Sequence, residues 1–352
     1  MKRQYYLDLA ATGLRTPVGT DLILHEKPDH AAILLDGKRL AGIMMEAAAA
    51  YKSPLAFPIM DLMLEKVAML GMMGIGGNVD SYHFDACPDD AAAAKFETNL
   101  RGSLPPRMQA NVQAVAEIVK ARKYLPIGMS IGPVSLMTKL LSDPITPIYA
   151  AASGVTAKED EEIRTLERVL EFSTQMVLRS VRAQIDAGAK AIFIAEPAAN
   201  VAYFSPMQMA KSTEIWDRYV MATNRRVKAL LNQHGVELIF HCCGELIDTM
   251  VKKFAELDPA ILSLGASRKL WEDAKIVPNT TVLYGNLPTK KFYSDDAISQ
   301  PQVVQTTCEL IKNMRATGHP FILGSECDVL SVPNCAGLIR KKVDLMLTCT
   351  CG

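Results

Sequence analysis

The chain has 352 residues, of which 49% are hydrophobic, so it can bury a large core and is not expected to be disordered. Lysine plus arginine and aspartate plus glutamate each total 38, and the resulting net charge of zero argues against a surface that binds nucleic acid phosphates. The sequence offers neither a signal peptide nor the roughly 20 apolar residues that span a bilayer, which predicts a cytoplasmic protein that does not enter membranes. In that setting the eight cysteines are expected to be thiols, not a disulfide framework.

Short apolar runs followed by helical patterns recur along the chain, and this alternation is typical of a parallel sheet. The runs predict eight strands: 55–61 (LAFPIMD), 74–79 (GIGGNV), 125–131 (LPIGMSI), 190–196 (KAIFIAE), 236–242 (VELIFHC), 261–265 (ILSLG), 281–286 (TVLYGN) and 320–327 (PFILGSEC). The second and sixth runs carry the weakest strand pattern.

Helices are predicted between several of these strands, at 107–123, 161–188 and 215–235, and the last two end at a glycine, as helices commonly do. Eight strands with intervening helices predict a (β/α)8 TIM barrel formed by about residues 51–352. A doubly wound open sheet is the alternative. About residues 1–50 form an expected N-terminal extension on the same single domain.

The segment LIFHCCGELIDTM, residues 238–250, places a histidine and two cysteines where the fifth predicted strand ends. Barrel enzymes carry their chemistry at the carboxyl ends of the strands. Side chains alternate along a strand, so His241 and Cys243 are predicted to face the barrel mouth and Cys242 the helices. A hydrogen-bonded histidine beside a buried thiol, without further function, is the alternative interpretation of this pair.

A third soft ligand, Cys327, ends the eighth predicted strand, and so is expected at the same rim. One imidazole and two thiolates suit zinc, and three protein ligands leave a position for a substrate, as in catalytic zinc sites. A further CxC, Cys349 and Cys351, lies within the last four residues, where chains commonly fray, so we do not expect it to bind metal functionally. The remaining cysteines, Cys87, Cys308 and Cys335, have no partner at metal-ligand spacing and are interpreted as packing residues.

At these residues the chain resembles the corrinoid-dependent methyltransferases of the uroporphyrinogen decarboxylase superfamily, which include the methylcobalamin:coenzyme M methyltransferases. The resemblance rests on His241, Cys243 and the distant Cys327, and on four further segments in the same order: 58–71 (PIMDLMLEKVAMLG), 131–141 (IGPVSLMTKLL), 184–200 (QIDAGAKAIFIAEPAAN) and 284–288 (YGNLP). It implies a zinc-dependent enzyme that moves a methyl group between a methyl-corrinoid, either on a corrinoid protein or as free methylcobalamin, and a small acceptor. A thiol or tetrahydrofolate would be the acceptor, and zinc would present a thiol as thiolate.

Further acidic and amide residues at the rim are candidates for the site. Glu196 and Glu326 are candidates for an exchangeable fourth zinc ligand, and strand alternation favours Glu196. Hydrogen bonding to backbone amides is the alternative interpretation of such a glutamate. Asp61 is predicted to accept a hydrogen bond from His241. Asn286 is predicted to bind substrate or an acidic partner. Loop capping is the alternative interpretation of both Asp61 and Asn286.

Two alternatives remain open. Uroporphyrinogen decarboxylase shares the fold, but its arginine-rich N-terminal segment has no counterpart, because the first 100 residues hold only Arg3, Arg15 and Arg39, which are not clustered. Decarboxylation of porphyrinogens also needs no metal. A non-catalytic zinc-binding subunit that docks a corrinoid protein would have a closed, four-ligand metal site and no turnover.

Overall fold

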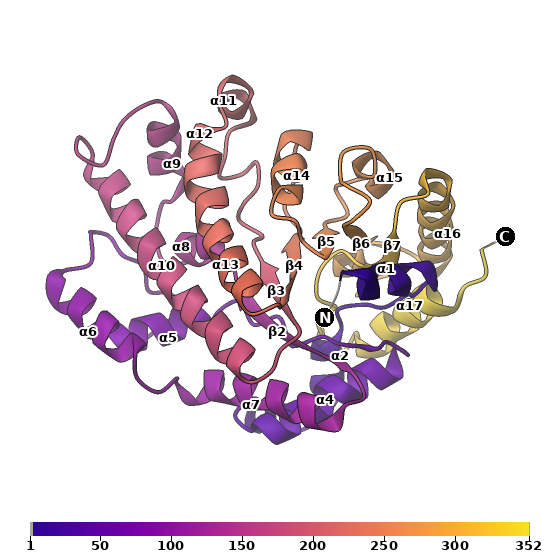
Figure 1. Ribbon diagram of the computed structural model, residues 1–352. Helices are drawn as coiled ribbons and strands as arrows, with labels where there is room; N and C mark the ends of the chain where they lie inside the picture. Colours follow the sequence, from indigo (N-terminus) through magenta and orange to yellow (C-terminus); the bar gives the residue numbers. More distant parts are fainter. Residues whose placement is uncertain (1–2, 352) are drawn as a thin grey trace.

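The computed structural model describes residues 3–351 and has a curled parallel sheet wrapped by helices, as expected for a TIM-barrel-like fold (Figure 1). Within these residues the sheet has seven strands in the order in which they follow one another along the chain. They are β1 (Leu55–Ala56), β2 (Leu125–Ile131), β3 (Ala191–Ala195), β4 (Glu237–Cys242), β5 (Ile261–Leu264), β6 (Val282–Leu287) and β7 (Phe321–Ser325).

Helices precede the sheet and fill most of the connections between its strands. They are α1 (Gln4–Ala11), α2 (Thr20–Leu24), α3 (His30–Ile33), α4 (Gly37–Ala50), α5 (Leu64–Met73), α6 (Asp90–Leu100), α7 (Pro106–Ala121), α8 (Pro133–Thr138), α9 (Ile145–Ala152), α10 (Glu161–Asp186), α11 (Pro206–Lys211), α12 (Glu214–Trp216), the π-helix η1 (Asp217–Met221), α13 (Ala222–Gln233), α14 (Asp248–Ala255), α15 (Leu270–Asp273), the 3-10 helix η2 (Thr289–Lys291), α16 (Gln300–Thr317) and α17 (Ala336–Thr348). No helix within residues 3–351 has the length and apolar character needed to cross a membrane.

The three predicted helices are confirmed, as α7, as α10 and as the continuous run from α12 through η1 to α13. Gly188 and Gly235, which follow the last two, have φ values of +99° and +63°. Glycine adopts this left-handed conformation without a steric penalty, so both residues end their helices as predicted.

The strand predicted at 74–79 is wrong, because these residues form no strand. Gly74 ends α5 with a φ of +79° and Gly77 has a φ of +92°, and neither conformation fits an extended strand. The N-terminal residues 15–20 instead lie beside β7 and reach Phe57, next to β1. In this segment Arg15 forms a parallel bridge with Leu323 of β7, and Thr20 Oγ1 donates to Phe57 O, next to β1, over 2.6 Å.

Two apolar clusters hold the fold together. A smaller one fills the inside of the curled sheet, from Phe193 and Ile239 on the strands to Tyr6 on α1, which covers one end. A larger cluster lies between the sheet and the surrounding helices. The side chains of each strand alternate between these two clusters, as the period of a β-strand requires, and this alternation positions the site described next.

Candidate metal site at the barrel mouth

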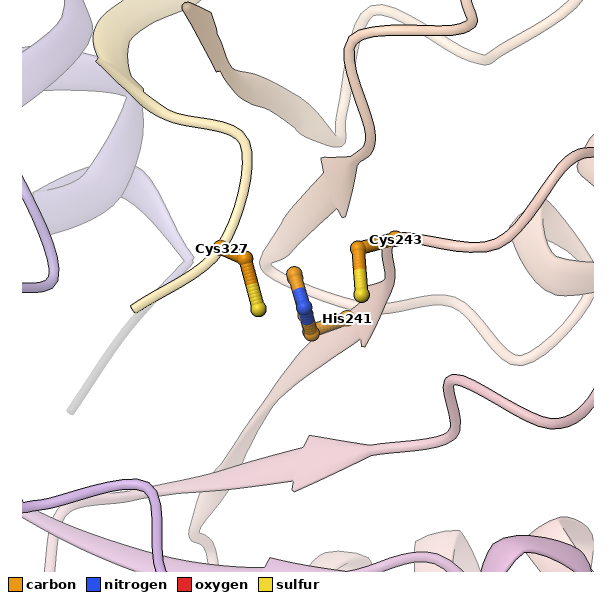
Figure 2. Close-up of side chains that lie close together, drawn as sticks. All are labelled: His241, Cys243 and Cys327. Carbon is orange, nitrogen blue, oxygen red and sulfur yellow. The ribbon is translucent and has the colours of Figure 1, made fainter. Parts of the chain in front are cut away.

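His241, Cys243 and Cys327 come together at the carboxyl ends of β4 and β7, although 84 residues separate the two cysteines in the sequence. Their ligand atoms all lie within 4.8 Å of one another. Figure 2 shows both thiols pointing toward the imidazole. The mouth of the sheet therefore brings together the three residues that the sequence pattern singled out.

His241 is 1% exposed and is held by its neighbours in the sheet. Its Nδ1 lies 2.8 Å from Ser263 Oγ on β5, and its ring lies 5.4 Å from that of Phe193, centroid to centroid. The other ring nitrogen, Nε2, is buried and has no hydrogen-bond partner among the described residues. A buried polar atom without a partner is costly, but an imidazole nitrogen with a free lone pair, together with two thiols, is a donor set that zinc uses. These residues fit a zinc ion.

Cys243 and Cys327 affect each other's ionisation in opposite directions. The neighbouring thiol of Cys327 lowers the pKa of Cys243 despite its burial, and His241 lowers it further. The neighbouring Cys243, together with burial, raises the pKa of Cys327. Burial disfavours the charge of Lys290 in η2, but Cys243, Cys327 and Glu326 outweigh burial and raise the pKa of Lys290. Cys243 and Cys327 can therefore carry a negative charge beside the ammonium group of Lys290.

The adjacent Cys242 faces the other way, as strand alternation predicts. It is fully buried in the cluster between sheet and helices, where its Sγ lies 3.4 Å from Ala199 O. Burial raises the pKa of Cys242 well above its usual value, so its thiol stays neutral.

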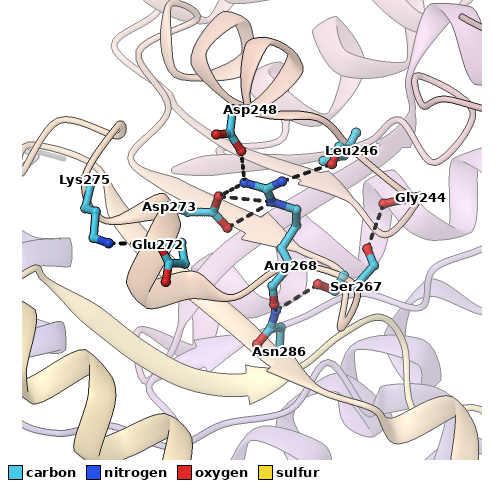
Figure 3. Close-up of polar contacts among 10 residues, drawn as sticks. Gly244, Leu246, Asp248, Ser267, Arg268, Glu272, Asp273, Lys275 and Asn286 are labelled. Atoms are coloured by element: carbon cyan, nitrogen blue, oxygen red, sulfur yellow. Dashed lines mark hydrogen bonds and ion pairs between the residues drawn. The ribbon is translucent and has the colours of Figure 1, made fainter. Parts of the chain in front are cut away.

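The loop after β5 is bonded to Gly244, Leu246 and Asp248, which follow Cys243 in the sequence (Figure 3). Asn286 Nδ2 donates to the carbonyls of Gly265 and Arg268, over 2.8 Å each. The guanidinium of Arg268 in turn donates to Leu246 O over 3.0 Å and pairs with the buried Asp273. Asn286 thus caps this loop and positions the backbone next to Cys243, and its predicted role in binding substrate stays a prediction.

Glu196 is not placed where a fourth ligand was predicted. It faces the helix layer, where its carboxylate accepts hydrogen bonds from Val134 N, Ser135 N and Asn224 Nδ2 at 2.8 to 3.0 Å. Its neighbour on β3, Ala195, pairs with His241 across the sheet and shares the inward face, so alternation turns Glu196 outward. The carboxylate therefore holds the turn at the start of α8, which is the amide-binding alternative.

The two other predicted acids also contact partners outside the ligand set. Asp61 follows β1 in an irregular segment, where it accepts from Met63 N and from Arg107 Nη2, the latter over 3.4 Å. Ser263, not the predicted Asp61, is the residue whose side chain lies at hydrogen-bond distance from His241 Nδ1. Glu326 is 8% exposed and accepts from Ala266 N and Lys290 N, so it bridges the loops after β5 and β6.

Ser263 and Lys290 were missed in the sequence, although each had a signal. Ser263 lies in the weakly patterned run 261–265, and alternation from Ile261 would have turned it toward the mouth. Lys290 follows directly after a strand end, in the segment NLPTKK. A small hydroxyl and a lysine are common in loops, so neither stood out.

Comparison with known proteins places this geometry in a family. The family model described as uroporphyrinogen decarboxylase (URO-D) matches residues 40–334, most of the chain. The chain belongs to the uroporphyrinogen decarboxylase family. A solved structure described as a methyltransferase from Methanosarcina mazei is similar to this family member with a TM-score of 0.66 and 16% identity, over 98% of both chains. At that identity the similarity shows the fold alone. No curated protein matches the chain.

Proposed function

We propose that this member of the uroporphyrinogen decarboxylase family is a zinc-dependent methyltransferase that moves a methyl group between a methyl-corrinoid and a small acceptor. The observation that carries the proposal is the clustering of ligand atoms of His241, Cys243 and Cys327 within 4.8 Å of one another at the mouth of the barrel, together with the buried Nε2 of His241, which has no hydrogen-bond partner among residues 3–351. A methyltransferase with the same fold is consistent with it.

His241, Cys243 and Cys327 would hold the zinc and leave one position free. Bound there, zinc would lower the pKa of an acceptor thiol and present it as a thiolate. The protein's own groups prepare this arrangement. Ser263 orients the imidazole. Hydrogen bonds from Arg268 and Asn286 hold the loops next to Cys243, and Lys290 offsets the charge of the thiolates.

The three N-terminal arginines weigh against a decarboxylase, because each is committed elsewhere. Arg3 pairs with Asp258 and Glu237, Arg15 donates to the carbonyls of Met346 and Cys349, and Arg39 pairs with Asp29. A porphyrinogen carries several carboxylates that would need such cations.

The test is methyl transfer from free methylcobalamin to coenzyme M, homocysteine and tetrahydrofolate, each assayed separately with the zinc-loaded protein. We expect turnover with one of the three, and loss of turnover together with zinc in Cys327→Ser. Zinc bound without turnover on any acceptor would instead support the non-catalytic docking subunit. Full zinc content in Cys327→Ser would remove Cys327 from the site.

A further inference from the structure

A second group of cysteines lies outside the site at the mouth. Cys308 is on α16, whereas Cys349 and Cys351 lie in the tail that follows α17. Their three Sγ atoms lie within 4.8 Å of one another, and all three residues are partly exposed. Cys308 and Cys351 form a disulfide, and the free Cys349 Sγ lies 4.0 Å from Cys351 Sγ.

This arrangement corrects two expectations from the sequence. The chain contains a disulfide, although all eight cysteines were predicted to be thiols. Cys308 was interpreted as a packing residue without a partner, yet it lies against the terminal CxC. The disulfide joins residues 43 positions apart and depends on the packing of α17 beside α16. The spacing of cysteines along the sequence does not reveal such packing.

The N-terminal segment holds the tail in place. Arg15 Nη1 donates to Met346 O over 3.3 Å and to Cys349 O over 2.9 Å, and it lies 3.6 Å from Cys349 Sγ. Arg15 is itself fixed by the bridge to Leu323 of β7. The tail is therefore anchored on the barrel, and a permanent positive charge lies beside its first thiol.

Against the expectation from the sequence that the CxC binds no metal functionally, we propose that Cys308, Cys349 and Cys351 form a second metal site, which binds one zinc ion when the disulfide is reduced. Two molecules of a thiol reductant supply two electrons and two protons to the Cys308–Cys351 bond and become one disulfide themselves. Zinc then replaces the protons of the three thiols. The donor set is purely sulfur, which selects soft or borderline cations over magnesium or calcium. Three thiolates around a divalent ion leave one negative charge, which Arg15 offsets.

The experiment measures zinc per chain by metal analysis. Protein is reduced without oxygen, incubated with zinc and freed of excess ion. We expect about two zinc ions in the reduced wild type, one at each site. We expect one zinc ion fewer per chain in Cys308→Ser, in Cys349→Ser and in wild type whose disulfide is left intact. Cys335→Ser, at the start of α17 and outside both groups, is the matched control and should keep the wild-type value.

Equal zinc content in the reduced wild type, Cys308→Ser and Cys349→Ser would overturn the proposal. Cys349 lies outside the disulfide, so Cys349→Ser keeps the oxidised cross-link and tests the site even if Cys308→Ser does not fold. The result is independent of the function proposed for the mouth. If the mouth binds no zinc, the counts become one in reduced wild type and none in Cys308→Ser, and the second site still stands.

Discussion

The Nδ1 of His241 lies 2.8 Å from the Oγ of Ser263, its direct partner across β4 and β5. When Nδ1 donates to this hydroxyl, the lone pair of the imidazole is on Nε2, which is buried and has no partner among the described residues. The register of two neighbouring strands thus places a hydroxyl where it can accept from Nδ1 and hold the tautomer that binds a metal.

Ser263→Ala should weaken zinc binding about 10- to 100-fold, because the group that orients a metal-bound histidine is lost. A competition titration with a zinc chelator measures the affinity. Ser173→Ala on α10 is the matched control, since Ser173 is equally buried and its Oγ has no partner among the described residues. Wild-type affinity in Ser263→Ala would mean that the Ser263 contact does not orient His241.

Two adjacent cysteines should respond in opposite ways to the same substitution. Cys243→Ala should lose the zinc of the mouth and methyl transfer, because two ligands hold the metal poorly. Cys242→Ala should keep both and lose about 1 kcal/mol of stability, the usual effect of deleting a small buried group. Zinc analysis and a denaturant titration of each variant distinguish these outcomes. Equal metal loss in both would show that the two thiols chelate together.

The buried Glu65 should make stability depend on pH. Its Oε1 accepts from Ser130 and Ser180, its Oε2 has no partner within residues 3–351, and burial raises its pKa from 4.5 to about 7. Between these values the folded state holds a proton that the unfolded chain has lost, so stability falls as pH rises from about 4.5 to 7 and then levels off. The loss is on the order of 3 kcal/mol.

Glu65→Gln should remove this part of the pH dependence, because the amide never ionises and can still accept from both serines. Urea unfolding at pH 5 and pH 8 measures it, with Glu97→Gln on α6 as a control at an exposed glutamate. The difference in free energy of unfolding between Glu65→Gln and wild type should shift in favour of the variant from pH 5 to pH 8. The same difference for Glu97→Gln should not change with pH. The same pH response in wild type and Glu65→Gln would place the titrating group elsewhere.

Decarboxylation of uroporphyrinogen should be absent in the wild-type protein. Arg3, Arg15 and Arg39 each pair with other parts of the chain and do not gather to bind the substrate's carboxylates. Product analysis after incubation with uroporphyrinogen checks this. Sustained turnover would restore the decarboxylase as the function of this site.

The sequence by itself determined the features that depend on local periodicity. The alternation of Ile239, His241 and Cys243 against Phe240 and Cys242 follows from the period of a strand, and the structure has the same two faces. Apolar runs located all seven strands, and glycines marked the ends of two long helices. The placement of Cys327 at the same rim followed because parallel strands all end on one side of a barrel.

Only the tertiary structure decided which side chains meet across the sheet. Whether Ser263 or Asp61 contacts His241 depends on the register between strands, and the inward pairing of Ala195 with His241 is what turns Glu196 toward α8. Residues 15–18, a segment without a strand pattern, pair with β7 and the residue Asp328 that follows it, because backbone groups at the edge of a sheet can pair with any extended chain that reaches them. Such contacts join distant residues, and their energies depend on packing that no local period encodes.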